Sequence, residues 1–477
     1  MPSMTPELRQ FKPGVYERFF RGVAFPLYES ILHRRDTSSY VAECERNQWL
    51  NPTELQALQL RKLNELLSHC WQHVPFLQRH WRAAGLNADA LTHVDALTRY
   101  PLMTKQLMTE NYADMVAVPW RGKTISKSTS GSTSEPFRFE YTQESYARRY
   151  AAAWRGYAWA GAGLGASTVY LWGASSTLSV FKRLKESAYH RAFNRYFINA
   201  NVQNTESLDH TIAELQKRKP QAIVGFVSPL ALLAQRMLDT GKTIPGLRGV
   251  VTAAEALYAH EREIIEKAFG CPAYNTYGSR EVMLMAAECG THHSLHVTAD
   301  QLVLETVNRS GERVNGEIGE VAVTDLHNFG MPFVRYLNGD RAKYSPVACG
   351  CGRSLPVLSS IDGRVLDLIE TPDGHFVSGE AFIIVFLGFP GVKRHQAVQI
   401  APNRLQVRVI LAPDWSVEQN QALLQQLQEL LGPSMEVQIT PVTAIADTPG
   451  GKRRTSVSFK NLATLGENQT EPLHTAG

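Results

Sequence analysis

The chain has 477 residues, which is enough for a large core and for more than one domain. Its formal net charge of +4 and its 20% of charged residues disfavour a dedicated nucleic-acid binder. It has no apolar run of the roughly 20 residues that a membrane span needs, no apolar core of a secretory signal, and too few cysteines for a disulfide framework. We therefore expect a cytoplasmic protein that binds neither nucleic acid nor membrane.

The first 120 residues are expected to be mostly helical. Leucines recur near the helical period between residues 55 and 67, and Asn51 and Pro52 before them are typical of a helix cap and first turn.

A loop rich in small hydroxyl residues follows, with the sequence STSGSTSEPF from Ser128 to Phe137. A glycine allows such a backbone to turn toward an anion, and its N–H and hydroxyl groups can donate to phosphate. The loop lacks the lysine of the common nucleotide-binding P-loop, and a solvated turn is the alternative. The candidate phosphate ligands are Ser130, Gly131, Ser132, Thr133 and Ser134.

Strand and helix patterns then alternate through the middle of the chain. Strands are expected at 168–173, 221–226 and from 249, with helices at 205–219 and at 228–238, where Ser228 is the expected cap. This alternation predicts a parallel sheet with helices on its faces and a ligand site at the carboxyl ends of its strands.

From about residue 300 the sequence becomes β-rich, and it ends in a small unit of its own. That unit has a strand at 404–412, a helix from Ser416 to Leu431 with a capping box to Gln419, and a strand at 435–442. We predict an α/β fold, with a large N-terminal domain of parallel-rich sheets and a β-rich subdomain, followed by a small C-terminal α+β domain.

Four further motifs carry groups that could serve a nucleotide. NTYGSREV offers Tyr277 for stacking on a planar ring, Gly278 for a turn and Glu281 for Mg²⁺. Asp340 could hold ribose hydroxyls, and Lys452 on a glycine-rich loop could reach a developing negative charge. The fourth motif, IDGRVLD, supplies Arg364. Each motif alone also fits a surface turn, a cap or a solvated basic run.

In this order the motifs resemble the adenylate-forming superfamily of acyl-CoA synthetases, in the branch of phenylacetate–CoA ligase-like and capsular-polysaccharide-biosynthesis proteins. The resemblance implies that a carboxylic acid and ATP form an acyl-adenylate with release of pyrophosphate. The acyl group then passes to CoA, the superfamily's usual acceptor, or to an amine. The aromatic residues Tyr170, Trp172 and Phe226 suggest a small aromatic acid, or belong to the core. A non-catalytic nucleotide-binding scaffold is the alternative function, and a homodimer is a possible oligomeric state.

The resemblance also implies roles for single residues. The loop 130–134 would hold the β- and γ-phosphates, Asp340 the ribose, Arg364 the ribose or a phosphate, and Glu281 the Mg²⁺. Ala254 and Glu255 would border the adenine together with Tyr277, and Lys452 would bridge the carboxylate and the α-phosphate. A hinge in the DGR motif would separate an adenylation domain, residues 1–363, from a mobile domain, residues 364–477.

Three residues depart from the family pattern. Ser134 stands where the phosphate loop often has glycine, Leu366 replaces the acidic or lysine hinge residue, and Arg280 replaces a threonine that touches the α-phosphate. Arg280 could take over that contact.

The cysteines suggest a second metal. Cys349 and Cys351 flank one glycine, and Cys289 precedes a histidine-rich turn. Three thiolates with His296 or His292 would make a closed tetrahedral Zn²⁺ site, and the same cysteine and histidine sequence pattern recurs in the resembled branch. Reduced thiols beside a histidine-rich turn are the alternative.

Overall fold

A computed structural model describes residues 11–32, 35–129, 137–172, 187, 189–199, 205–292, 294–364, 369–374, 376–377, 379–445 and 455–459. The predicted phosphate loop 130–134, Leu366 and Lys452 lie outside these residues. The described chain divides into two compact units: a large one that extends to Ile361, and a small one that contains the chain from Asp362 together with the short segment Gly339–Arg341. No described helix is long and apolar enough to cross a membrane.

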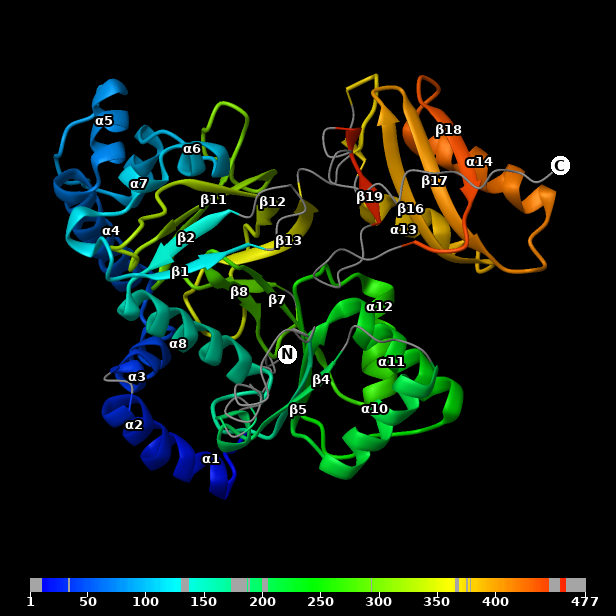
Figure 1. The fold of residues 1–477 in the computed structure, drawn as a ribbon, viewed down its shortest axis with the longest axis horizontal. Helices are drawn as coiled ribbons and strands as arrows, with labels where there is room; N and C mark the ends of the chain where they lie inside the picture. The colour runs from blue at the N-terminus through cyan, green and yellow to red at the C-terminus, as the bar shows by residue number, and fades with distance from the viewer. Residues whose placement is uncertain are drawn as a thin grey trace, which may run out of the picture. The chain divides into compact units, whose positions relative to one another are not determined.

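The N-terminal part of the large unit is helical, as predicted (Figure 1). Asn51 accepts from the Glu54 backbone N–H at 2.9 Å, and the Glu54 carboxylate accepts from the Asn51 N–H at 3.0 Å, so a capping box starts the longest of these helices. The helices are α1 (Val15–Phe19), η1 (Phe20–Ala24), α2 (Phe25–Leu27), η2 (Tyr28–Leu32), α3 (Thr37–Asn47), α4 (Pro52–His73), α5 (Pro75–Ala83), η3 (Val94–Arg99), α6 (Lys105–Glu110), α7 (Tyr112–Met115), η4 (Val118–Trp120) and α8 (Gln143–Trp159).

One sheet of eleven described strands organises the large unit, in the order β10-β11-β12-β13-β9-β8-β7-β6-β5-β3-β4. Its strands are β3 (Thr168–Trp172), β4 (Arg195–Asn199), β5 (Ala222–Phe226), β6 (Gly249–Ala253), β7 (Ala273–Ser279), β8 (Met283–Glu288), β9 (Leu295–Val297), β10 (Leu302–Val307), β11 (Ile318–Asp325), β12 (Tyr336–Tyr344) and β13 (Val357–Arg364). A separate hairpin pairs β1 (Ile125–Ser128) with β2 (Arg138–Tyr141).

Strand β7 joins two kinds of pairing. It is parallel to β6, as β6, β5, β3 and β4 are to one another, and it is antiparallel to β8. The predicted parallel sheet therefore covers about half of the large sheet, and the β-rich subdomain continues it in antiparallel pairing.

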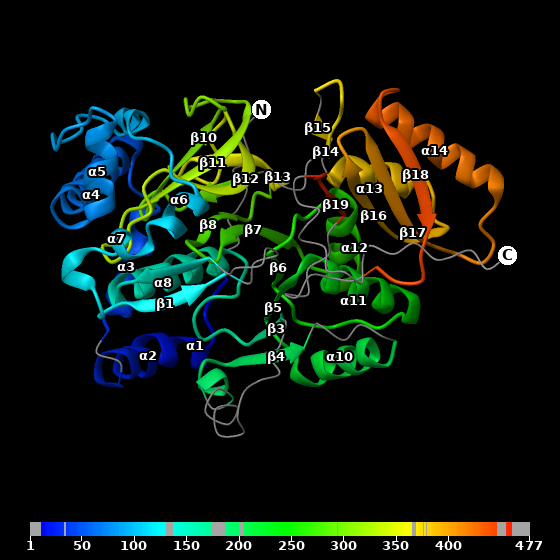
Figure 2. The same ribbon diagram turned by 45° about the horizontal axis from the view of Figure 1, so that its top comes forward.

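Helices α10 (Thr205–Arg218), α11 (Val227–Thr240) and α12 (Ala259–Phe269) cover one face of the parallel strands (Figure 2). Successive side chains of a strand point to opposite faces of the sheet, so one set packs against these helices. Val250 packs toward the helices, whereas Val251 packs on the opposite face with Tyr274. The prediction that Ser228 caps α11 is wrong, because α11 begins at Val227 and its N-cap is Phe226.

The small unit is the predicted α+β unit. Strands β16 (Val392–Ala401), β17 (Arg404–Leu411), β18 (Glu436–Pro441) and β19 (Ser456–Val457) form one sheet, with α13 (Gly379–Leu387) and α14 (Val417–Leu431) beside it. β14 (Ile369–Glu370) pairs with β15 (Phe376–Val377). The Ser416 side chain accepts from the Gln419 N–H at 3.2 Å and the Gln419 side chain accepts from the Ser416 N–H at 2.9 Å, so the predicted capping box is confirmed.

Candidate functional site

The carboxyl ends of β6 and β7 carry several of the predicted nucleotide residues. Directly after β6, Ala254 has a positive φ of 68°, an unusual backbone conformation for a residue with a side chain. Next to it, the Glu255 carboxylate accepts a hydrogen bond of 2.7 Å from the backbone N–H of Ser228 at the start of α11. This bond ties the loop after β6 to the first turn of α11, which directly follows β5.

Tyr277 and Gly278 lie on β7, where the pairing with β8 shifts in register. The buried Tyr277 hydroxyl accepts from the Asn338 side chain at 2.8 Å, and Asp340 follows two residues later on β12. A Cβ at Gly278 would lie 2.1 Å from the carbonyl oxygen of Met283, so only glycine fits there.

Glu281 is a buried carboxylate, 5% exposed, in the turn between β7 and β8. The Tyr336 hydroxyl donates to its Oε1 at 3.0 Å, and Lys105 Nζ lies 3.7 Å from the same oxygen. The Tyr141 hydroxyl donates at 2.6 Å to the carbonyl of Arg280, which precedes it. The carboxylate is therefore held in place by neighbours on β12 and α6.

Sequence reasoning missed the residues that support this turn. Arg149 of α8 pairs with Asp325 at the end of β11, donates to the backbone carbonyl of Glu281, and lies 3.7 Å over the ring of Tyr141. Arg149 stands in the run YARRYAAAW, which gives no sign that Arg149 is buried whereas its neighbour Arg148 is only partly buried. Lys105 stands in no recognisable motif, and Tyr336 belongs to the motif RYLNGDRA, of which only Asp340 was singled out.

Three cysteines and one histidine come together on the antiparallel side of the sheet. The ligand atoms of Cys289, His296, Cys349 and Cys351 all lie within 4.8 Å of one another. The sulfurs of Cys289 and Cys349 are 3.7 Å apart, close to the roughly 3.8 Å expected for two thiolates on one tetrahedral Zn²⁺. The donor set therefore fits a closed structural zinc site.

The pairing of β9 with β13 shows which of the two candidate histidines lies beside the cysteines. His296 pairs with Val357 across β9 and β13, its Nδ1 lies 3.3 Å from the Leu355 carbonyl, and its Nε2 lies 3.2 Å from Cys351 Sγ. The ring of His292 instead packs against Tyr274, with 4.6 Å between the ring centroids. The geometry thus places His296, and not His292, among the cysteines.

Hydrogen bonding in the cluster favours a thiolate. A hydrogen bond from the Cys289 thiol, with His296 and Arg353 as further partners, lowers the pKa of Cys351, whereas the same coupling raises the pKa of Cys289. Metal-binding cysteines are thiolates, so these contacts favour at Cys351 the form that a metal requires.

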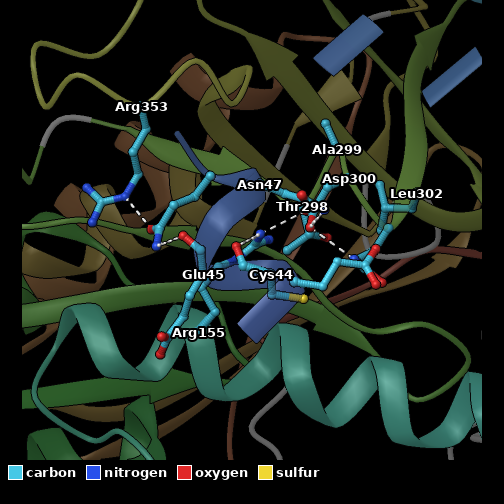
Figure 3. A network of polar contacts seen from close by, with 12 residues as sticks. Cys44, Glu45, Asn47, Arg155, Thr298, Ala299, Asp300, Leu302 and Arg353 are labelled. Atoms are coloured by element: carbon cyan, nitrogen blue, oxygen red, sulfur yellow. Dashed lines mark hydrogen bonds and ion pairs between the residues drawn. The ribbon is translucent and has the colours of Figure 1, made fainter. Parts of the chain in front are cut away.

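A buried polar network adjoins the cluster (Figure 3). The Arg353 guanidinium lies between the rings of Trp49 and Trp159, 4.7 Å from each centroid, and its Nε donates to the Gln48 side chain at 2.8 Å. Further along α3, Arg155 of α8 donates to the Cys44 carbonyl at 3.1 Å and pairs with Asp300 at 2.9 Å. These contacts attach the cysteine turn to α3 and α8.

Comparisons with known proteins agree with this architecture. Residues 369–458 match the family model described as the CapK C-terminal domain. The chain is 28% identical over 339 residues to phenylacetate-coenzyme A ligase of Escherichia coli (strain K12), an alignment that covers 66% of this chain and 72% of that protein. It is 23% identical over 440 residues to protein CapK of Staphylococcus aureus, covering 90% of this chain and 94% of CapK.

Among solved structures, a 2-hydroxyisobutyryl-CoA ligase in the postadenylation state has a TM-score of 0.70 at 20% identity, covering 88% of this chain and 93% of that chain. This likeness shows that the fold is that of the adenylate-forming ligases. In sequence, the chain is similar to phenylacetate-coenzyme A ligase and to protein CapK, and its C-terminal residues match the CapK model.

Proposed function

We propose that this protein activates a carboxylic acid with ATP, forms an acyl-adenylate with release of pyrophosphate, and passes the acyl group to the thiol of CoA. The observation that carries the proposal is Glu281, a carboxylate held by Tyr336 and Lys105 beside the carboxyl ends of β6 and β7. Ligands of α/β sheets bind at such strand ends. Relatives in this branch include phenylacetate-coenzyme A ligases, which supports CoA as the acceptor.

The chemistry requires little covalent participation by the protein. The carboxylate of the acid attacks the α-phosphorus of ATP, the bond to the bridging oxygen breaks, and pyrophosphate leaves. The protein's part is to position the two anions and to offset the charge that develops between them. Lys452 would bridge the carboxylate and the α-phosphate, and Arg280 would contact the α-phosphate.

The remaining nucleotide contacts are assigned by motif. Residues 130–134 would hold the β- and γ-phosphates, Asp340 the ribose, and Arg364 the ribose or a phosphate. Ala254, Glu255 and Tyr277 would border the adenine. The large unit would be the adenylation domain, and the chain from residue 364 a mobile domain.

Two metals would accompany this function. Glu281 would hold Mg²⁺ together with oxygens of the bound ATP, since Mg²⁺ in such sites needs only one or two protein carboxylates. Zn²⁺ held by Cys289, His296, Cys349 and Cys351 would fix the turn after β8 to the segment before β13. That metal would stabilise the sheet without joining the reaction.

The acid is proposed to be small and aromatic. Trp172 at the end of β3 packs on Phe226 at the end of β5, with 4.4 Å between the ring centroids. Both lie at the same edge of the parallel strands as Glu255, which would suit an aryl group.

Pyrophosphate release tests the proposal. The full chain is incubated with ATP, Mg²⁺ and a panel of aromatic and aliphatic acids, first without an acceptor and then with CoA or an amine. We expect acid-dependent release without CoA and an acyl-CoA product, identified by mass spectrometry, once CoA is present. Glu281→Gln should lower the rate by about two orders of magnitude, since the metal would lose its carboxylate ligand.

The matched control is Glu65→Gln, because Glu65 is an exposed carboxylate paired with Arg61 on α4. This variant should keep the full rate. No pyrophosphate release with any acid would support a non-catalytic nucleotide-binding role, and an amide product in place of a thioester would reassign the acceptor.

A further inference from the structure

An apolar stripe runs along the outer side of the N-terminal helical segment, residues 11–32. Of the fifteen exposed large hydrophobic side chains among the described residues, six fall between Val15 and Ile31. Five of them are spaced by four residues: Val15, Phe19, Val23, Leu27 and Ile31, with exposed fractions of 77, 56, 47, 52 and 68%.

The helix geometry keeps this stripe on one side. In an α-helix of 3.6 residues per turn, a spacing of four drifts by about 40° at each step. Here α-helical turns alternate with the π-helical turns η1 and η2, whose wider i→i+5 bonding reverses the drift. The spacing of four therefore gives a nearly straight line of side chains.

The opposite side of the segment is anchored in the core of the large unit. Phe20 and Phe25 are 4% and 1% exposed, and the ring of Phe25 packs edge-on against Trp154 of α8 at 5.1 Å. In both ribbon views, α1 and α2 lie at the margin of the large unit (Figures 1 and 2). The stripe is thus held rigidly on the surface.

Charge is divided between the two sides in the same way. Glu17 and Glu29, the acidic residues of this segment, are 8% and 6% exposed. Glu17 pairs with Arg248 at 3.2 Å, and Glu29 accepts from the Thr37 hydroxyl. Lys12 and Arg18 are exposed, so the outward charges of residues 11–32 are cationic.

We propose that this face binds the surface of a bilayer that contains anionic lipids. The apolar side chains would enter the boundary between headgroups and acyl chains, while Lys12 and Arg18 pair with headgroup phosphates. This attachment lies in the membrane plane and needs no spanning helix. The sequence expectation of no membrane binding rested on the lack of a spanning apolar run, which an attachment in the membrane plane does not require.

A second copy of the chain fits this face less well. The five side chains expose on the order of 500 Å², whereas a stable interface buries about 800 Å² on each partner. Two such faces brought together would also oppose the cations Lys12 and Arg18 to their own copies.

Sedimentation with lipid vesicles tests the proposal. The full chain should pellet with vesicles of equal parts phosphatidylcholine and phosphatidylglycerol, and much less with phosphatidylcholine alone. The double variant Phe19→Ser, Leu27→Ser should lower the partition coefficient at least tenfold, since it removes much of the inserted apolar surface. Arg18→Gln should lower it about fivefold, and only with the anionic vesicles.

Val417→Ser is the matched control, because Val417 is 70% exposed on α14 of the small unit. It should bind vesicles as the unchanged chain does. Three results would overturn the proposal: no pelleting with anionic vesicles, equal partition of the double variant and the unchanged chain, or a dimer in light scattering that the double variant abolishes. Equal melting temperatures of all variants would show that the changes act on the surface alone.

Discussion

Replacing Asp300 by asparagine should destabilise the large unit strongly. Asp300 and Arg155 are 0% and 1% exposed, and their ion pair measures 2.9 Å. Asparagine would leave the Arg155 guanidinium charged, buried and without its counterion. Removing one partner of a buried ion pair lowers the free energy of unfolding by about 3–5 kcal/mol. The Cys44 carbonyl still accepts from Arg155, so we expect a loss near the lower end of that range.

The measurement is urea unfolding followed by tryptophan fluorescence. Seven of the eight tryptophans precede Ile361, so the signal reports mainly on the large unit. The matched control is Asp114→Asn, whose partner Arg79 lies at 2.7 Å on the surface, with side chains 41% and 58% exposed. That change should cost no more than about 1 kcal/mol.

A double replacement separates the charge from the packing. Arg155→Met with Asp300→Leu removes both charges and should recover most of the loss, as apolar replacements of buried pairs do. If Asp300→Asn costs no more than Asp114→Asn, the pair is not buried as described, and the reasoning fails.

Three further predictions follow from the metal cluster, the mobile domain and one buried histidine. Purified protein should contain one zinc per chain, and Cys351→Ser should lose it and melt at a lower temperature; protein without zinc would contradict the site. Lys452→Ala should slow adenylation by about two to three orders of magnitude and largely spare thioester formation from preformed adenylate, and equal loss of both would exclude the bridging role. Burial, with Lys62 beside it, holds the pKa of His327 well below its usual 6.5, so stability should fall as pH drops below about 6.5, where only the unfolded chain gains the proton. Measured by urea unfolding, the contribution of His327 should approach about 1.4 kcal/mol per pH unit, so the fall should be less steep in His327→Gln and unchanged in the exposed control His93→Gln; His69 and His80, whose pKa values burial also lowers, account for part of the fall that stays.

Much of the fold could be predicted because its local signals agree with its packing. The uninterrupted apolar run at residues 222–226 forms β5, buried at every position, and the cap at Ser416 starts α14 where the pattern placed it. The predicted cap at Ser228 failed because the helix begins at Val227, which places Ser228 in the first turn, where the Glu255 carboxylate, 27 residues away, accepts from its backbone N–H. A contact between distant segments overrode a local preference.

The site was predictable only where a motif marks it. Glu281 and Tyr277 stand in a recognisable order, whereas Arg149, Arg155 and Asp300 are polar residues whose burial depends on partners more than a hundred residues away. The exposed N-terminal stripe was hidden for a related reason. Spacing by four ordinarily indicates a buried α-helical face, and no residue of the segment signals the π-helical turns that keep these exposed side chains in one line.

The position of β7 limits how this sequence can change over evolution. The strand is bonded to parallel β6 on one side and to antiparallel β8 on the other, and it carries Tyr277 and Gly278. Because side chains alternate across a strand, inserting or deleting one residue within β7 would turn each later side chain to the opposite face. Variation in length among homologues should therefore fall in surface loops, such as the turn before β11, and should spare residues 273–281.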